Sequence, residues 1–194
     1  HGLIPGSTIP TLKVETVDGG YRVSGRSSWG SGIMHADWAI MSGLREDGEA
    51  IVFVLPATDL AVGDVWHMSA MAGTGSNDMI CKDAFVPEHR AMRHSEFYAG
   101  DTAGTRLNGR FYAIPILPFV YCEVMGVYAG ALRGAVDAFA DDLRERARMH
   151  SGAKVKEQQF SHIQLGEALA AADIAEELMR SQAGMSQACV EAGA

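Results

Sequence analysis

Apolar and polar residues alternate with a period of two through the first half of the chain, which is the pattern of strands with one buried face. Three pairs of such runs are separated by segments rich in glycine and acidic residues: residues 11–17 and 21–26, 37–44 and 50–56, and 62–71 and 79–87. Glycine and aspartate between two alternating runs are typical of hairpin turns. The pattern predicts about six antiparallel strands in a barrel or sandwich.

The apolar period changes to that of a helix after Pro118. The helical pattern continues until Ser151 and Gly152 interrupt it, and a second helical run begins near Lys156. Because glycine costs a helix roughly 1 kcal/mol relative to alanine, a face on which it recurs is expected to admit another helix. Three such glycines are spaced four residues apart in the first run: Gly126, Gly130 and Gly134.

Two long, alanine-rich antiparallel helices form half of a four-helix bundle. The predicted fold class is therefore α+β, with an antiparallel β-barrel-like domain at residues 1–108 and a helical hairpin at residues 109–194. A hairpin alone cannot bury both of its faces, so we expect further helices or another subunit to complete the bundle.

The segment 111–132 is long and apolar, with Glu123 as its one charged residue. Pro115 and Pro118 interrupt it, whereas a membrane span needs about 20 predominantly apolar residues in succession. The segment therefore favours a buried core helix over a membrane span.

The formal net charge of −8 argues against a nucleic-acid-binding protein, which needs a basic surface. The three cysteines are widely spaced and form no CxxC pair, which favours a reducing cytoplasm. The first ten residues also lack the basic start and apolar run of a secretory signal. We expect a cytoplasmic protein that binds neither nucleic acid nor membrane.

The sequence contains no HExxH, GxGxxG or P-loop motif. His35 and Asp37 offer two metal ligands without a third, so a hydrogen bond that stabilises a turn is the better interpretation, and no metal site is predicted. Two other stretches carry candidate binding residues, and both also have a purely structural interpretation.

The first stretch is SSWGSG, at residues 27–32. Trp29 could anchor the rim of a barrel, or it could stack on a planar ligand while Ser31 and the adjacent backbone N–H bind the edge of that ligand. The second stretch is AGTGSND, at residues 72–78. It is either a flexible hairpin loop or a loop that presents polar groups and closely approaching backbone to a ligand.

Residues 19–38 (GGYRVSGRSSWGSGIMHADW), followed by GTGSNDMICKDAFVPEHR, resemble the middle β-domain of the acyl-CoA dehydrogenase fold. The closer resemblance is to the two-component flavin-dependent monooxygenases (group D) that share this fold. In the dehydrogenases, a Trp-x-Thr element at this position packs against the flavin ring and hydrogen-bonds it. The segment Trp29-Gly30-Ser31 matches that element, with serine in place of threonine.

The helical part of the chain, with HIQLGEALAAAD, is similar to the start of the C-terminal four-helix domain of that family. The family also has an N-terminal helical domain and further C-terminal helices, which we expect to be absent from this chain. Those further helices carry the base of the dehydrogenases and the active-site histidine of the monooxygenases.

The resemblance implies an enzyme that takes reduced FMN or FAD from a separate flavin reductase and uses O2 to hydroxylate an aromatic or polyketide-like small molecule. It also implies a homotetramer, since the family buries its C-terminal helices in a tetramer core. Ser31 is the implied catalytic residue, through a hydrogen bond near flavin N5. The implied flavin contacts are Trp29, Gly30, Ser31, Gly32, Ser7 in the segment LIPGST, and Arg148 or its neighbour Arg146 at a phosphate. The implied substrate contacts are Thr74, Ser76 and Asn77.

Two alternatives remain open at the level of sequence. An acyl-CoA dehydrogenase would oxidise an acyl thioester with FAD, and Glu123 lies near the place where some family members carry the base. A lone carboxylate without a partner seldom identifies a base, so a buried or interface position is the favoured interpretation of Glu123. The second alternative is a non-catalytic fragment that keeps the fold without a flavin.

Overall fold

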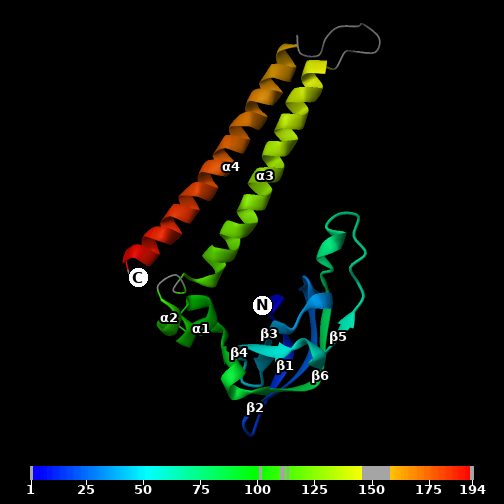
Figure 1. Ribbon diagram of the computed structural model, residues 1–194, viewed down its shortest axis with the longest axis vertical. Coiled ribbons are helices and arrows are strands. Elements are labelled where there is room, and N and C mark those ends of the chain that lie inside the picture. Colours follow the sequence, from blue (N-terminus) through cyan, green and yellow to red (C-terminus); the bar gives the residue numbers. More distant parts are fainter. Residues whose placement is uncertain (1, 101, 110–111, 113, 146–157, 193–194) are drawn as a thin grey trace. The chain divides into compact units, whose positions relative to one another are not determined.

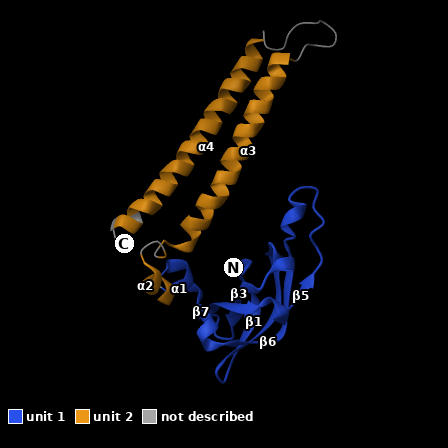
Figure 2. Ribbon diagram, in the orientation of Figure 1, with its two compact units in different colours: residues 1–102 blue, residues 103–194 orange. Residues whose placement is uncertain are grey.

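The computed structural model describes residues 2–100, 102–109, 112, 114–145 and 158–192 (Figure 1). The chain divides into two compact units, residues 1–102 and residues 103–194 (Figure 2). The boundary predicted from the sequence, between residues 108 and 109, falls at the end of the short helix α2 (Ala103–Asn108). The first unit contains the strands and the second contains the long helices, which confirms the α+β class.

The strands of the first unit form one seven-stranded sheet with the order β5-β6-β2-β1-β3-β4-β7. Their bounds are β1 Gly6–Val17, β2 Gly20–Gly30, β3 Trp38–Arg45, β4 Ala50–Pro56, β5 Leu60–Gly63, β6 Asn77–Pro87 and β7 Ala91–Arg93. The one α-helix of this unit among the described residues is α1, at His94–Ala99. The sheet thus brings β2 and β6, distant in sequence, side by side.

Two of the predicted hairpins are confirmed with the expected turns. Strands β1 and β2 pair antiparallel around Gly19, which has φ 74°, a conformation that glycine adopts without steric cost. Strands β3 and β4 pair antiparallel around Gly48, which has φ 84°. Strands β1 and β3 pair in parallel, and the prediction of an entirely antiparallel sheet is wrong at this pair. The alternation of apolar and polar residues within a strand does not specify which strands distant in sequence will pair with it.

The third predicted hairpin is present, but its first strand is shorter than expected. Strand β5 ends at Gly63, whereas the sequence predicted a strand through residue 71. The reason is Asn77, whose Oδ1 accepts hydrogen bonds from the backbone N–H groups of Val65 (2.9 Å) and Trp66 (3.0 Å). Those two N–H groups are therefore committed to a side chain and not to a neighbouring strand.

The core of the first unit lies on the inward face of the sheet. Strand positions two residues apart, such as Leu12 and Val14 or Ala39 and Met41, are buried while the residue between them is more exposed, as the alternating pattern predicts. The largest buried side chains of this core are Phe53, Leu12, Met41, Leu55 and Met79. This packing fixes the ends of β2 and β6, where the candidate site residues lie.

The second unit contains two long helices, α3 (Ile116–Glu145) and α4 (Gln159–Ala192). On each helix, the residues that are buried or half-buried between them recur at alternating intervals of three and four, which is a coiled-coil seam. The seam of α3 is Cys122, Gly126, Ala129, Arg133, Val136, Ala140 and Leu143, and that of α4 is Ser161, Leu165, Ala168, Ala172, Ala175, Met179, Gln182 and Ser186. The predicted antiparallel hairpin is therefore confirmed.

Helix α3 carries a second apolar face that α4 does not cover. Large apolar side chains recur on it at helical spacing and are exposed: Leu117, Val120, Tyr121, Val124, Val127 and Tyr128. Within the described residues, α3 is therefore not the buried core helix that the sequence predicted. Its length and hydropathy alone would also allow it to cross a membrane, although a single such helix is weak evidence for a span.

A methyl group at Gly130 or Gly134 would meet no atom within 4 Å, so these glycines face open space in the hairpin.

Candidate functional site

The end of β2 turns sharply and leaves a tryptophan exposed. Trp29 has φ 65°, in the left-handed region, and 65% of its surface is exposed. The N–H of Ser31 donates to the carbonyl oxygen of Trp29 across 2.9 Å, which closes the turn. A large aromatic residue pays a steric cost in this conformation, and such residues persist where the surroundings impose them, often at binding sites.

Gly30 allows this turn to lie against the core. A Cβ atom at Gly30 would lie 2.7 Å from Cγ of the buried Met79 on β6, closer than real Cβ atoms approach. Glycine is therefore required by packing here, and a flavin contact from Gly30 would come from its backbone. The residue also marks a register shift in the β2–β6 pairing. This irregularity redirects the chain so that the indole of Trp29 is exposed.

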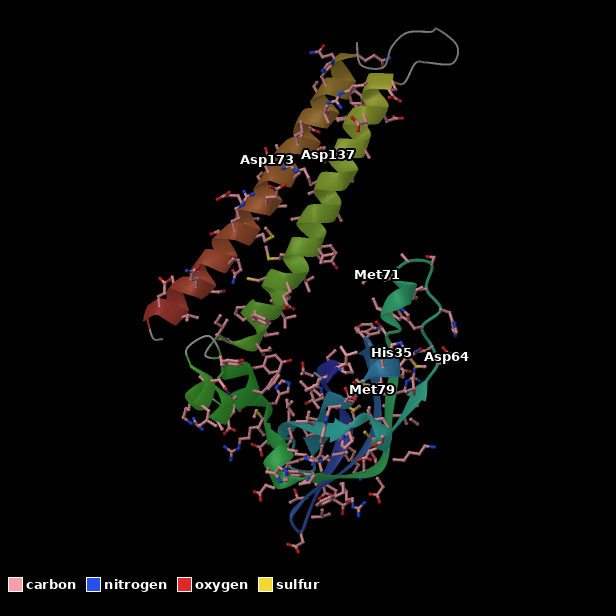
Figure 3. The ribbon with its side chains drawn as sticks, in the orientation of Figure 1. His35, Asp64, Met71, Met79, Asp137 and Asp173 are labelled. Atoms are coloured by element: carbon pink, nitrogen blue, oxygen red, sulfur yellow. The ribbon has the colours of Figure 1, made fainter. Side chains whose placement is uncertain are left out.

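The loop between β5 and β6 is bonded to this turn, although the two are more than 40 residues apart in sequence. The N–H of Gly32 donates to the carbonyl oxygen of Thr74 across 2.8 Å. The Oγ atoms of Ser31 and Ser76 lie 2.8 Å apart, and Ser76 Oγ lies 2.7 Å from Thr74 Oγ1. Thr74 Oγ1 in turn donates to the carbonyl oxygen of Met71 across 3.0 Å. Figure 3 shows Met71 in this loop and Met79 on β6.

Two of the predicted substrate contacts are buried beneath this loop. Ser76 is 4% exposed and Asn77 is 7% exposed, and Asn77 Oδ1 is occupied by two backbone N–H groups. The carboxylate of Asp78, also buried, pairs with the guanidinium of Arg26 on β2. These contacts hold the loop against the sheet. Direct substrate contact by Thr74, Ser76 and Asn77 stays a prediction.

The turn and the loop together present a flat aromatic surface next to one hydroxyl. The indole of Trp29 can stack on a planar ring system, as exposed aromatic residues do in ligand sites. The backbone N–H groups of Ser31 and Gly32 are both engaged within the protein, so the hydroxyl of Ser31 is the polar group that this turn offers to the edge of a ligand. The predicted contact through the adjacent backbone N–H therefore has no free donor at Ser31 or Gly32.

The structure also reveals a polar cluster that the sequence did not indicate. Thr8 Oγ1 lies 2.5 Å from the phenolic oxygen of Tyr98, and His94 Nε2 lies 3.1 Å from the carbonyl oxygen of Thr8. The rings of His94 and Tyr98 stack with their centroids 4.3 Å apart. The sequence signal for the stacking of His94 on Tyr98 is their spacing of four residues, which places both on the same face of a helix.

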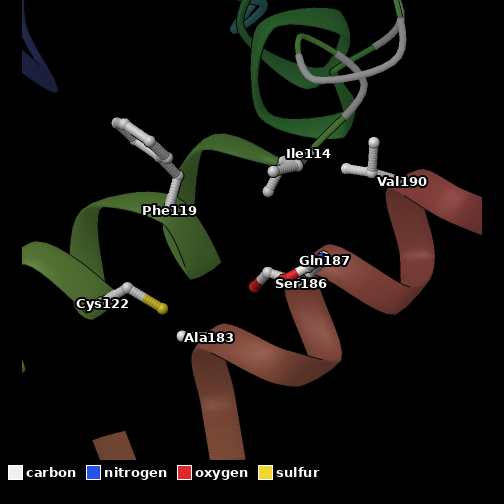
Figure 4. Close-up of a pocket in the computed structure, with 7 residues that line it drawn as sticks. All are labelled: Ile114, Phe119, Cys122, Ala183, Ser186, Gln187 and Val190. Carbon is white, nitrogen blue, oxygen red and sulfur yellow. The ribbon is translucent and has the colours of Figure 1, made fainter. Parts of the chain in front are cut away.

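The helical unit has a groove of about 370 Å³ near the start of α3 and the end of α4 (Figure 4). It is lined by Ile114, Phe119, Cys122, Ala183, Ser186, Gln187 and Val190. Among the described residues, the lining contains no carboxylate or histidine, so these residues offer no acid–base pair. Glu123, the candidate dehydrogenase base, is exposed on α3, so it is not buried within this chain, and a position at an interface stays a prediction.

Comparison with known proteins identifies the family. The profile "Acyl-CoA dehydrogenase, C-terminal domain" matches residues 124–194. A pigment production hydroxylase from Rhodococcus sp. is 41% identical over 184 residues, which are 92% of this chain and 48% of that protein. The oxygenase component of an FADH2-dependent resorcinol hydroxylase from Rhizobium sp. is 31% identical, over 98% of this chain and 49% of that protein. These proteins identify flavin-dependent monooxygenases as the family that the chain resembles.

A solved structure supports the same assignment. The 3-HSA hydroxylase from Rhodococcus sp. RHA1 matches with a TM-score of 0.84 at 31% identity, over 98% of this chain and 50% of that one. The resemblance to two-component flavin-dependent monooxygenases of the acyl-CoA dehydrogenase fold is thereby confirmed. The chain spans about half the length of the relatives that it matches.

The remaining predicted flavin contacts are Ser7 and Arg148, with Arg146 as its alternative. Ser7 lies near the start of β1, half-buried and paired in register with Met41 of β3. Arg148 and Arg146 lie outside the described residues. The carboxylate of Asp37 accepts the N–H of Leu3 across 3.1 Å, a hydrogen bond between segments distant in sequence, so its predicted role in stabilising a turn stays a prediction. Across the described ranges, no three metal-ligating side chains gather at one place.

Proposed function

We propose that this chain is part of the oxygenase component of a two-component monooxygenase that hydroxylates an aromatic or polyketide-like small molecule. The observation that carries the proposal is the exposed, strained Trp29 with the hydroxyl of Ser31 beside it, in a chain that resembles this family. The names of two relatives, a resorcinol hydroxylase and a p-hydroxyphenylacetate 3-hydroxylase, support an aromatic substrate.

Reduced flavin, when bound, would activate O2 and supply the oxygen atom that enters the substrate. The residues at the end of β2 fit a planar, polar-edged group. The indole of Trp29 would cover one face of the flavin ring, and Ser31 would hydrogen-bond the flavin at N5. The backbone at Gly30 and Gly32 would lie along the ring, with Ser7 and Arg148 as further proposed contacts. The name of the resorcinol hydroxylase favours FAD over FMN as the reduced flavin.

The partners follow from this proposal. An oxygenase component receives its flavin from a separate flavin reductase, with O2 and the small-molecule substrate as the other reactants. We further propose a homotetramer in the cytoplasm, in which additional helices and other subunits cover the exposed apolar face of α3. This proposal is supported by the width of that face, since a helix that is apolar on both sides is normally enclosed by other helices.

The test is an anaerobic titration of the protein with reduced FAD and reduced FMN, followed by addition of oxygen. The measured quantities are flavin binding and the rate at which hydrogen peroxide appears. We expect tight binding of one reduced flavin and release of peroxide more slowly than from the free reduced flavin, because the site excludes water.

Two other outcomes would favour the alternatives. Tight binding of oxidised FAD, together with its reduction by an acyl-CoA thioester, would identify an acyl-CoA dehydrogenase. Absence of binding to either flavin in either redox state would leave a non-catalytic member of the fold, and the proposed function would be wrong.

A further inference from the structure

Three hydroxyl groups form a chain that ends on a backbone carbonyl. The chain runs from Ser31 Oγ to Ser76 Oγ (2.8 Å), to Thr74 Oγ1 (2.7 Å), and to the carbonyl oxygen of Met71 (3.0 Å). A carbonyl oxygen can only accept, whereas each hydroxyl has one proton to donate and two lone pairs. The carbonyl therefore sets the direction in which the hydroxyl groups donate their protons.

Only one direction makes all three hydrogen bonds. Thr74 donates to the carbonyl of Met71, so Ser76 must donate to Thr74, and Ser31 must donate to Ser76. In the opposite direction, Thr74 would donate to Ser76, and its oxygen would face the carbonyl oxygen at 3.0 Å with no proton between them. An unmade hydrogen bond between two close acceptors is costly, so the first direction is preferred.

Ser31 is the exposed end of this chain. Because its proton points inward to Ser76, the hydroxyl offers a ligand only lone pairs. The two neighbouring backbone donors are also engaged, since the N–H of Ser31 bonds Trp29 and the N–H of Gly32 bonds Thr74. This edge of the turn is therefore an acceptor without a donor beside it.

We propose that Thr74 and Ser76 are positioning residues that make the site prefer reduced over oxidised flavin. The inference rests on the proposed function, in which Ser31 lies at flavin N5. Reduced flavin carries a proton on N5 and can donate it to Ser31, whereas the N5 of oxidised flavin carries only a lone pair. Two lone pairs that face each other repel, so the fixed direction of the chain disfavours the oxidised form.

This preference suits a protein that receives its flavin from a separate reductase. Reduced flavin would be captured from solution, and oxidised flavin would leave after turnover. The hydroxyls of Thr74 and Ser76 would act through Ser31 and need not touch the flavin. Ser76 is buried and Thr74 is half-buried in the loop, which is consistent with that indirect role.

The test compares the dissociation constants of reduced and oxidised FAD, measured anaerobically for the wild-type protein and for Thr74→Val. Valine keeps the shape of threonine but removes the link to the carbonyl, so the Ser31–Ser76 pair can donate in either direction. We expect the ratio of the oxidised to the reduced dissociation constant to fall about tenfold, the worth of one hydrogen bond. For this two-electron couple, the midpoint potential of bound FAD would fall by about 30 mV.

Three further variants separate this effect from damage to the loop. Thr74→Ser keeps the hydroxyl and should keep the wild-type ratio. Ser76→Ala removes the acceptor of Ser31 and should lower the ratio as Thr74→Val does. Thr58→Val removes an exposed hydroxyl that donates to Asp59 in the same unit and should leave the ratio unchanged.

The outcomes distinguish the inference from the function on which it rests. A wild-type protein that prefers reduced FAD, with Thr74→Val and Ser76→Ala retaining the full ratio, would overturn the inference and leave the proposed function standing. Equal binding of both redox states by the wild-type protein would also overturn the inference. A wild-type protein that binds no flavin would overturn both.

Discussion

Replacement of Trp29 by glycine should separate the stability of the protein from its affinity for flavin. Trp29 is 65% exposed, so roughly a third of a side-chain surface of about 250 Å² is buried, worth about 2 kcal/mol of unfolding free energy. Its φ of 65° costs a non-glycine residue about 1–2 kcal/mol, which glycine recovers. Trp29→Gly should therefore unfold within about 1 kcal/mol of the wild type.

Trp29→Ala is the matched control, because alanine loses the same buried surface without relieving the backbone. We expect its unfolding free energy to fall by about 2 kcal/mol. Both variants lose the stacking surface. If bound flavin covers half of the exposed indole, about 80 Å², the loss is about 2 kcal/mol, or roughly a 30-fold rise in the dissociation constant.

Urea denaturation measures the first quantity, and anaerobic titration with reduced FAD measures the second. Unchanged affinity in both variants would refute the stacking of Trp29 on flavin. An equal loss of stability in the glycine and alanine variants would refute the argument that the backbone of this turn is strained.

Four further predictions concern single side chains. Ser31→Ala should raise the hydrogen peroxide released per hydroxylated product, and unchanged coupling in a peroxide assay would contradict a contact at N5. Arg26→Gln should lower the unfolding free energy by about 2 kcal/mol, because the carboxylate of Asp78 stays buried without its partner; the double variant with Asp78→Asn should recover most of the loss. Burial, and to a smaller extent the negative charge of a nearby aspartate, raises the pKa of the Cys81 thiol from 9.0 to about 11. Because the folded state holds this proton more tightly than the unfolded state, the unfolding free energy should fall by up to about 2–3 kcal/mol as the pH rises from about 9 to about 11. The variant Cys81→Ala should lose this part of the pH dependence. Gly43→Ala should destabilise the sheet by about 1–3 kcal/mol in thermal unfolding, because its methyl group would lie 2.5 Å from a carbonyl oxygen of the parallel strand β1.

The helical unit offers a clear case in which local sequence was sufficient. The seam residues of α3 and α4 recur at intervals of three and four, and this period depends only on the geometry of a helix. The glycines on α3 show where that reasoning stops. Their spacing predicted a face that admits another helix, yet Gly130 and Gly134 face open space in the hairpin. Periodicity identifies a face but does not identify what covers it.

The candidate site divides in the same way. The motif Trp29-Gly30-Ser31 pointed to a planar ligand through its resemblance to the Trp-x-Thr element of the dehydrogenases, whereas the residue types alone also allowed an anchor at the rim of a barrel. The sequence could not show that the backbone donors of this turn are already engaged, nor that Ser76 and Asn77 are buried. Substrate contact by Thr74, Ser76 and Asn77 stays a prediction, but nothing in the sequence indicated the hydrogen bonds by which these residues support the loop and Ser31.

The sequence by itself determined the elements that depend on neighbouring residues: the β1–β2 and β3–β4 hairpins, with glycine in the left-handed turns, and the two long helices. Tertiary structure alone decided the parallel pairing of β1 with β3, the early end of β5 at Gly63, and the hydroxyl chain that joins Ser31 to Ser76. Each of these three features depends on groups distant in sequence, which meet only when the chain is packed. Local propensity carries no information about such contacts, because it is set by the residues within a few positions.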